Sequence, residues 1–249
     1  MLQQTRVETA TAYWLRFMER FPSVAALAAA DEDEVLALWS GLGYYRRARN
    51  LHAAARAIVA AGGAFPSTRE QLLELPGVGP YTAGAVASIA FDRPEPLVDG
   101  NVARVFARWF ELRDAPGGAL EARSWGIARE LVPERGAGEW NQALMELGAL
   151  VCKPRSPECA SCPVREDCGA LRSECVSELP VPKPRRAPID VRLCMFVCRA
   201  GDALLLERRA AGGRMAGMWQ LPTLEIGPGT ALFPQAGSEG SGLALEAGG

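Results

Sequence analysis

Four cysteines in one short segment carry the clearest chemical signal in the sequence. They are Cys152, Cys159, Cys162 and Cys168, with the spacing C-x6-C-x2-C-x5-C. Four thiolates gathered in one loop can surround a zinc ion or an iron–sulfur cluster, because both accept tetrahedral sulfur ligation. The prolines between these cysteines keep the segment out of a helix. The spacing therefore predicts a metal-binding loop and leaves the choice of metal open.

A glycine turn, a helix and one carboxylate follow one another in residues 75–101. Gly77 and Gly79 flank one apolar residue, so the turn can adopt positive φ and expose backbone N–H groups where Pro80 opens a helix. Such a turn suits a phosphate. Asp99 precedes the next amphipathic segment, where aspartate is also a favoured helix cap. From the residues alone, Asp99 is either a cap or a site residue.

The stretch Gly41–Asn50 combines two glycines, two tyrosines and three arginines. Aromatic rings beside positive charges are typical of nucleic-acid-binding surfaces. An exposed helix start would explain the arginines, but not adjacent tyrosines on a glycine turn. We therefore predict a local nucleic-acid-binding patch here. His52, the only histidine, is interpreted as a packing or surface residue rather than a catalyst.

The composition excludes binding that depends on overall charge. The chain has 249 residues and a formal net charge of −2, so any DNA binding must use a local patch. No apolar run is long enough to span a membrane, and no leader segment is recognisable. We expect a cytoplasmic, monomeric protein without membrane contact, in which cysteines serve as metal ligands or buried thiols rather than disulfides.

Helical periodicity dominates the sequence before residue 150. It is clearest in residues 1–20 and 35–40, in the alanine-rich segment that ends at Gly62, and in residues 119–131 and 138–151. Helix-capping motifs are expected at Asp31 to Glu34 and at Ser67 to Glu70. No stretch of this region alternates like a strand for long, so the first part of the chain is predicted to be all-α.

The remaining elements divide the chain into four parts. We predict a helical domain over 1–150, a cysteine loop over 151–178, a proline-rich linker over 179–189 and a small domain over 190–249. Within the last part, residues 191–197 and 203–207 are predicted to be strands joined at Gly201-Asp202.

In combination, these features resemble the helix-hairpin-helix DNA glycosylases that carry a [4Fe–4S] cluster. Met-Leu-Gln-Gln-Thr at 1–5 and Gly-Leu-Gly-Tyr-Tyr at 41–45 are similar to the MutY-type adenine DNA glycosylases, and the resemblance covers about residues 1 to 225. It implies a mainly α helix-hairpin-helix glycosylase fold with an iron–sulfur loop. A partial α/β MutT-like (Nudix-like) domain would follow, which helps such enzymes recognise 8-oxoguanine.

The resemblance also implies a reaction, namely removal of adenine mispaired with 8-oxoguanine or guanine in double-stranded DNA. Asp99 would stabilise positive charge on the sugar, and Tyr81 would lie near the sugar–phosphate. The hairpin residues that would grip a phosphate are Pro76, Gly77, Val78 and Gly79. The other implied DNA- or lesion-contacting residues are Gln4, Thr5, Leu42, Tyr44, Arg46 and Gln142, and the four cysteines would bind the cluster.

Two departures from the family pattern affect catalysis. The family's general-acid glutamate lies two residues before the Met-Leu-Gln-Gln-Thr segment, and this sequence begins at that Met. We expect either a start codon further upstream or a poor catalyst. Tyr81 stands where lyase relatives carry a Schiff-base lysine, and the only lysines are Lys153 and Lys183, so a purely hydrolytic glycosylase is expected. The alternatives are a lesion-binding module that does not cleave and a zinc-bound structural DNA binder.

Overall fold

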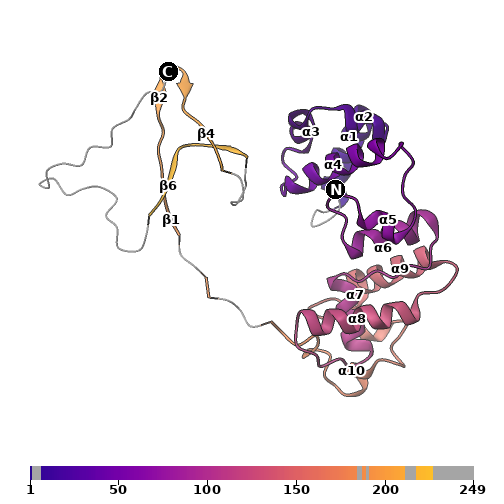
Figure 1. Ribbon diagram of the computed structural model, residues 1–249. Coiled ribbons are helices and arrows are strands. Elements are labelled where there is room, and N and C mark those ends of the chain that lie inside the picture. The colour runs from indigo at the N-terminus through magenta and orange to yellow at the C-terminus, as the bar shows by residue number, and fades with distance from the viewer. Residues whose placement is uncertain (2–6, 184–186, 189–190, 211–216, 227–249) are drawn as a thin grey trace, which may run out of the picture. The chain divides into compact units, whose positions relative to one another are not determined.

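The computed structural model describes residues 1, 7–183, 187–188, 191–210 and 217–226 (Figure 1). The chain forms two compact units, Met1–Pro184 and Arg185–Gly249. The boundary between them falls inside the predicted proline-rich linker. None of the helices in the described part of the chain has the length and apolar character that a membrane span requires.

The first helices of the larger unit form a small bundle. They are α1 (Val7–Arg20), α2 (Val24–Ala29), α3 (Glu32–Trp39) and α4 (Arg46–Ala60). Phe17, Phe21 and Trp39 meet in its core with ring centroids 4.9 and 6.2 Å apart. The helix predicted over 1–20 is confirmed from Val7 onward, and residues 2–6 lie outside the described residues.

The predicted capping box at the start of α3 is wrong. Asp31 is the N-cap residue, but its side chain makes no capping hydrogen bond. The neighbouring carboxylates face other helices instead: Glu34 accepts from Arg20 at 2.6 Å, and Glu32 accepts from Arg49 at 2.9 Å. In contrast, a helix cap is present within the motif predicted at Ser67 to Glu70, but the capping residue of α5 is Thr68, one position after Ser67, and its hydroxyl accepts from the Gln71 N–H at 3.4 Å.

A second group of helices carries the glycine turn and the carboxylate. They are α5 (Arg69–Leu73), α6 (Pro80–Phe91), α7 (Gly100–Trp109), α8 (Gly118–Leu131) and α9 (Ala137–Glu146), which continues as the π-helical turn η1 (Leu147–Val151). Helix α7 packs against α8, α9 and η1, and α6 packs against α5 and α9. The core between them contains Leu97, Val102, Phe106 and Leu144.

The cysteine loop folds back onto α7. It contains the short 3-10 turn η2 (Cys159–Ser161) and α10 (Gly169–Arg172), which contacts α7. Arg108, 3 % exposed, holds the loop from α7. Its guanidinium donates to the carbonyls of Lys153 at 2.7 Å, Pro154 at 3.2 Å and Leu179 at 2.9 Å.

The smaller unit consists of short antiparallel strand pairs. Its strands are β1 (Arg192–Met195), β2 (Arg199–Ala200), β3 (Ala203–Leu204), β4 (Glu207–Arg208), β5 (Trp219–Gln220) and β6 (Thr223–Ile226). The pairs are β1 with β6, β2 with β3, and β4 with β5. The predicted strands over 191–197 and 203–207 are present as shorter pieces, and Gly201 at φ +61° lies in the turn between β2 and β3.

Candidate active site and cysteine loop

A groove of about 710 Å³ lies between the N-terminal helices and the glycine turn. One wall is formed by Trp14 of α1, Trp39 of α3 and Arg47 of α4, and the other by the turn and by Tyr81 of α6. Its volume falls within the range of pockets that enclose small molecules. Among the described residues that line it, none is an aspartate or glutamate.

The glycine turn sits against helix α4. Gly77 has φ +77°, and a Cβ added there would lie 2.4 Å from the side chain of Asn50, so only glycine fits this approach. Gly79 differs from the prediction: its φ is −98°, and it is the N-cap of α6. Pro80 follows at the first helical position. The prediction of positive φ thus holds for Gly77 and is wrong for Gly79, whose extended backbone leads directly into the helix.

Asp99 is the N-cap of α7, so one of its two possible roles is settled. Its Oδ1 accepts the N–H groups of Asn101 at 2.9 Å and Val102 at 2.8 Å, and its Oδ2 accepts from the Asn101 side chain at 3.2 Å. The residue is half-buried. These bonds fix the orientation of the carboxylate at the positive end of the helix.

Tyr81 connects the groove wall with Asp99 and with α9. Its hydroxyl donates to the Met145 sulfur of α9 at 3.4 Å. Burial, followed by the nearby Asp99 carboxylate, raises the pKa of Tyr81. The phenol therefore stays neutral at physiological pH and keeps its O–H group for donation. The structure thus brings together the two residues predicted to act at the sugar.

A chain of hydrogen bonds runs from Asp99 to the cysteine loop. Asn101 contacts Asp99, and Arg104 donates to the Asn101 side-chain oxygen at 2.9 Å. The same guanidinium donates to the Cys152 carbonyl at 2.9 Å and to the Gly148 carbonyl at 2.7 Å. Arg104 is not among the residues predicted from the sequence to act in the site. The sequence feature that points to such a role is the pair Arg104 and Arg108, four residues apart within the most apolar part of α7. Arginines in such a place need buried hydrogen-bond acceptors.

The four predicted ligand cysteines line one cavity. Its walls also include Val105, Trp109 and Leu147. Burial raises the pKa of the Cys162 thiol, and the other three cysteines contribute in the same direction. The Arg108 guanidinium approaches the Cys152 sulfur at 3.4 Å. Within the described ranges, no group of three or more His, Cys, Asp or Glu side chains has the arrangement needed to hold a single metal ion.

The residues predicted to contact DNA have different environments. Tyr44 is 64 % exposed at φ +49°, and Arg46 is exposed at the start of α4. Leu42 is buried in the N-terminal core. Gln142 is exposed on α9, and its side-chain nitrogen donates to the Gly138 carbonyl at 3.1 Å. The DNA contacts of all four residues stay predictions, and Gln4 and Thr5 lie outside the described residues.

Arg47 and Trp39 support the loop that carries Tyr44, a role missed in the sequence. The Trp39 indole N–H donates to the Gly43 carbonyl at 3.1 Å. Arg47 donates to the carbonyls of Leu42 at 3.3 Å and Gly43 at 3.5 Å, and its guanidinium lies over the Tyr44 ring at 5.4 Å. Such contacts compensate the cost of positive φ at a tyrosine.

Known relatives of this chain are adenine DNA glycosylases. The chain is 37 % identical to that of Arabidopsis thaliana over 90 % of its own length and 41 % of the relative. It is 35 % identical to that of Schizosaccharomyces pombe over 91 % and 59 %, and 37 % identical to that of Homo sapiens over 95 % and 52 %. The chain therefore spans about half the length of the curated relatives it matches. These matches confirm the resemblance drawn from the motifs.

Two solved structures share the fold of this chain. A thermostable thymine-DNA glycosylase superposes with a TM-score of 0.61 at 29 % identity, covering 69 % of this chain and 80 % of that one. Endonuclease III in a non-covalent DNA complex superposes with a TM-score of 0.59 at 26 % identity, covering 70 % and 80 %. The pattern that defines the HhH-GPD superfamily base excision DNA repair proteins matches residues 1–130. That match includes more than half of the sequence, and the chain belongs to this superfamily.

Proposed function

We propose that the protein is a monofunctional adenine DNA glycosylase that acts on adenine opposite 8-oxoguanine or guanine in double-stranded DNA. The observation that carries this proposal is the carboxylate of Asp99, oriented by its capping bonds and near Tyr81, the tyrosine that lines the groove. The names of the related enzymes support the choice of adenine.

The residues of the groove and its surroundings match the requirements of this reaction. A base inside a duplex is out of reach, so adenine must flip into a pocket, and the groove is large enough to enclose a base. Breaking the N-glycosidic bond places positive charge on the sugar, which the Asp99 carboxylate stabilises. Its capping bonds prevent the carboxylate from turning away.

Hydrolysis rather than a lyase reaction follows from the available nucleophiles. A Schiff base needs a lysine at the sugar, and Tyr81 occupies the wall of the groove instead. The side chain of Lys153 pairs with Glu158 at 2.5 Å in the cysteine loop, and Lys183 is in the linker segment. Water is therefore the acceptor of the sugar.

The glycine turn supplies a phosphate site beside the groove. The first backbone N–H groups of α6 have no partner within the helix, and they lie at its positive end. Gly77 keeps the turn pressed against α4. A DNA phosphate bound there would hold the strand while adenine enters the groove.

The four cysteines are proposed to hold a [4Fe–4S] cluster. Thiolates around one zinc ion lie within about 4 Å of one another, because each Zn–S bond is about 2.3 Å. In a four-iron cluster each thiolate binds a different iron, so the ligands are further apart. The four cysteines that line one cavity supply the four thiolates that such a cluster requires. When bound, the cluster supplies a cross-link that fixes the loop.

The metal proposal is tested on the purified protein. A brown protein that absorbs in the visible range and contains iron supports the cluster. A colourless protein that contains zinc in place of iron contradicts it and favours the structural zinc alternative.

The strand pairs of the smaller unit are proposed to belong to a MutT-like domain that helps to read 8-oxoguanine. Support comes from the antiparallel pairing of β1 with β6 and from the sequence around residues 204–222. The nucleotide-hydrolase acidic helix of MutT-like enzymes is not found in the sequence, so recognition rather than hydrolysis is proposed for this unit.

A single-turnover assay on a duplex with one A:8-oxoguanine pair tests the function. We expect adenine release by this chain, or by a variant with Glu-Val added ahead of Met1, which supplies the family's general acid. If neither protein releases adenine, the enzymatic proposal is wrong. Tight and selective binding of the duplex without release of adenine would favour a lesion-binding module. This module is the second candidate function because no carboxylate is found among the described residues that line the groove.

A further inference from the structure

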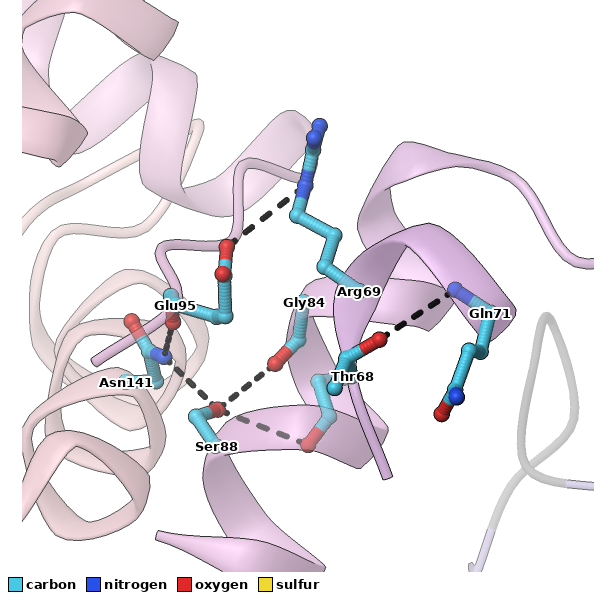
Figure 2. Close-up of polar contacts among 8 residues, drawn as sticks. Thr68, Arg69, Gln71, Gly84, Ser88, Glu95 and Asn141 are labelled. Atoms are coloured by element: carbon cyan, nitrogen blue, oxygen red, sulfur yellow. Dashed lines mark hydrogen bonds and ion pairs between the residues drawn. The ribbon is translucent and has the colours of Figure 1, made fainter. Parts of the chain in front are cut away.

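A buried polar network joins Asn141, Ser88, Gly84 and Glu95 (Figure 2), and none of them is among the described residues that line the groove. Asn141 of α9 is 1 % exposed, and its side-chain nitrogen donates to the Ser88 hydroxyl of α6 at 2.9 Å. The same nitrogen donates to the Glu95 carbonyl at 2.8 Å. The Ser88 hydroxyl in turn donates to the Gly84 carbonyl at 2.8 Å. Both amide hydrogens of Asn141 are therefore used, one for each neighbouring segment.

Glu95 belongs to the connection between α6 and α7, which ends at Asp99. This connection lies directly on α6, since a Cβ added at Gly84 would be 2.1 Å from the Pro96 carbonyl oxygen. Helix α9 is equally close to α6, where a Cβ at Gly138 would be 2.7 Å from the Ser88 carbonyl oxygen. Three backbones thus meet around the Asn141 side chain.

Helix α9 contacts Tyr81 and the connection that leads to Asp99. Four residues after Asn141, the Met145 sulfur accepts the Tyr81 hydroxyl. Residues four apart lie on the same face of a helix. A single helix face therefore holds the Tyr81 hydroxyl through Met145 and the approach to Asp99 through Asn141.

We propose that Asn141 is a positioning residue that sets the distance of Asp99 from Tyr81 and the groove by fixing the Glu95 carbonyl to α6 and α9. The proposal rests on the role of Asp99 in the proposed function. Asn141 is not among the described residues that line the groove, and its side chain bonds Ser88 of α6 and the Glu95 carbonyl, so it acts on Asp99 through the connection 92–98. An aspartate could not replace it, because its carboxylate would face the Glu95 carbonyl without a hydrogen to donate.

The test compares two buried serines as well as Asn141 itself. Asn141→Leu removes both hydrogen bonds at similar volume, and Ser88→Ala removes one of the two acceptors. Ser124→Ala is the matched control, because Ser124 is equally buried and its hydroxyl donates to the Leu120 carbonyl at 2.7 Å, four residues earlier. We expect the single-turnover rate to fall about 100-fold in Asn141→Leu. It should fall less in Ser88→Ala and stay unchanged in Ser124→Ala, with lesion-duplex binding retained in all three.

A second readout does not depend on activity. The charge of Asp99 contributes to the raised pKa of Tyr81, so movement of Asp99 changes the pH at which Tyr81 titrates. The ring signals of labelled tyrosines, followed by NMR over alkaline pH, report this value directly. We expect a lower Tyr81 pKa in Asn141→Leu and Ser88→Ala than in the native chain. The Ser124→Ala control should match the native chain.

The titration is repeated in an Asp99→Asn background. There the carboxylate charge is gone, so Asn141→Leu should no longer change the Tyr81 pKa. An equal change in both backgrounds would mean that Asn141 alters the burial of Tyr81 rather than the position of Asp99, and would overturn the proposal. An unchanged Tyr81 pKa in Asn141→Leu would overturn it as well. A native chain without glycosylase activity contradicts the proposed function but leaves this measurement intact.

Discussion

At the scale of single residues, Asp99 combines its structural role as a helix cap with the chemical role that we propose for it. Oδ1 accepts the two backbone N–H groups at the start of α7, while Oδ2 contacts the Asn101 amide. The first role needs an oxygen acceptor, and the second needs a negative charge. Because asparagine keeps the acceptor and loses the charge, the two roles can be separated by one substitution.

Asp99→Asn should leave the fold intact and remove turnover. Asparagine caps helices about as well as aspartate, so the free energy of unfolding should change by less than about 1 kcal/mol. The single-turnover rate should fall by about 1,000-fold or more, because charge stabilisation at the sugar is lost. Urea unfolding and adenine release measure these two quantities. Asp31→Asn, at another helix N-cap, is the control. If duplex binding falls by as large a factor as the rate, Asp99 acts only as a helix cap and the proposed chemical role is wrong.

Glu95 provides a prediction with a defined pH dependence. Burial, only partly offset by Arg69 at 3.6 Å, raises the pKa of the Glu95 carboxyl. A group whose pKa is higher in the folded chain stabilises the fold when protonated, and this contribution is lost as the pH rises through the raised value. Glu95→Gln should therefore be as stable as the native chain or more stable at neutral pH, by less than about 1 kcal/mol.

The measurement for Glu95 is urea unfolding at several pH values. The difference between Glu95→Gln and the native chain should shrink toward acid pH, below the ordinary pKa of a glutamate. A variant that is clearly less stable than the native chain at neutral pH would show that the ion pair with Arg69 dominates over burial.

At the scale of elements, the active site depends on how closely three backbones approach. Helix α6 carries Tyr81, the connection 92–98 carries Asp99 to its place, and α9 holds both. Gly84 and Gly138 allow this packing, because a side chain at either position would meet a backbone carbonyl. The positions of Tyr81 and Asp99 relative to each other are therefore set by backbone contacts as well as by side chains.

Gly84→Ala should destabilise the protein, and Gly126→Ala should not. The added Cβ at Gly84 would lie 2.1 Å from the Pro96 carbonyl oxygen, and backbone cannot move away as a flexible side chain can. We expect a loss of about 2 kcal/mol or more in the free energy of unfolding. Gly126, inside α8, has no neighbour within 4 Å, so alanine there should stabilise by about 0.5–1 kcal/mol. Urea unfolding of both variants measures the two changes in the free energy of unfolding. Equal changes in the two variants would contradict this prediction.

At the scale of the whole molecule, the chain consists of two separately packed units. The groove, the network around Asn141 and the cysteine cavity all belong to Met1–Pro184. The described strands of the smaller unit expose apolar side chains such as Leu193, Met195 and Trp219. The stability of each unit therefore depends on the packing within that unit.

A chain that ends at Pro184 should keep the fold of the larger unit. Its melting temperature, followed by helical circular dichroism, should match the helical transition of the full chain, because the helical cores contain only residues of that unit. Adenine release from A:G pairs should also persist. The preference for A:8-oxoguanine over A:G should decrease if residues 185–249 help to read the lesion. An unchanged preference would remove that role from the smaller unit.

Features that depend on neighbouring residues could be predicted from the sequence. Spacing predicted the cysteine loop, a helix cap was predicted within Ser67 to Glu70, and Pro80 was predicted to open α6. Each is a local pattern, and local backbone geometry is determined within a few residues. One failure was a local rule overridden by distant partners, and the other was a glycine whose backbone follows from the adjacent helix. The acidic run at Asp31 pairs with arginines of other helices, and the extended backbone at Gly79 is set by the helix that it caps.

Only the tertiary structure decided which side chains meet. Tyr81 and Met145 are 64 residues apart, Asn141 and Ser88 are 53 apart, and Arg104 and Cys152 are 48 apart. Contacts of this kind arise from helix packing, which depends on the whole core and not on any one segment. The sequence by itself determined which chemical groups this protein carries, since residue types and local spacing are written in it. The packing of α6, α7 and α9 decided the distances between these chemical groups. The helices pack closely at glycines, whose contacts lie in other segments of the chain.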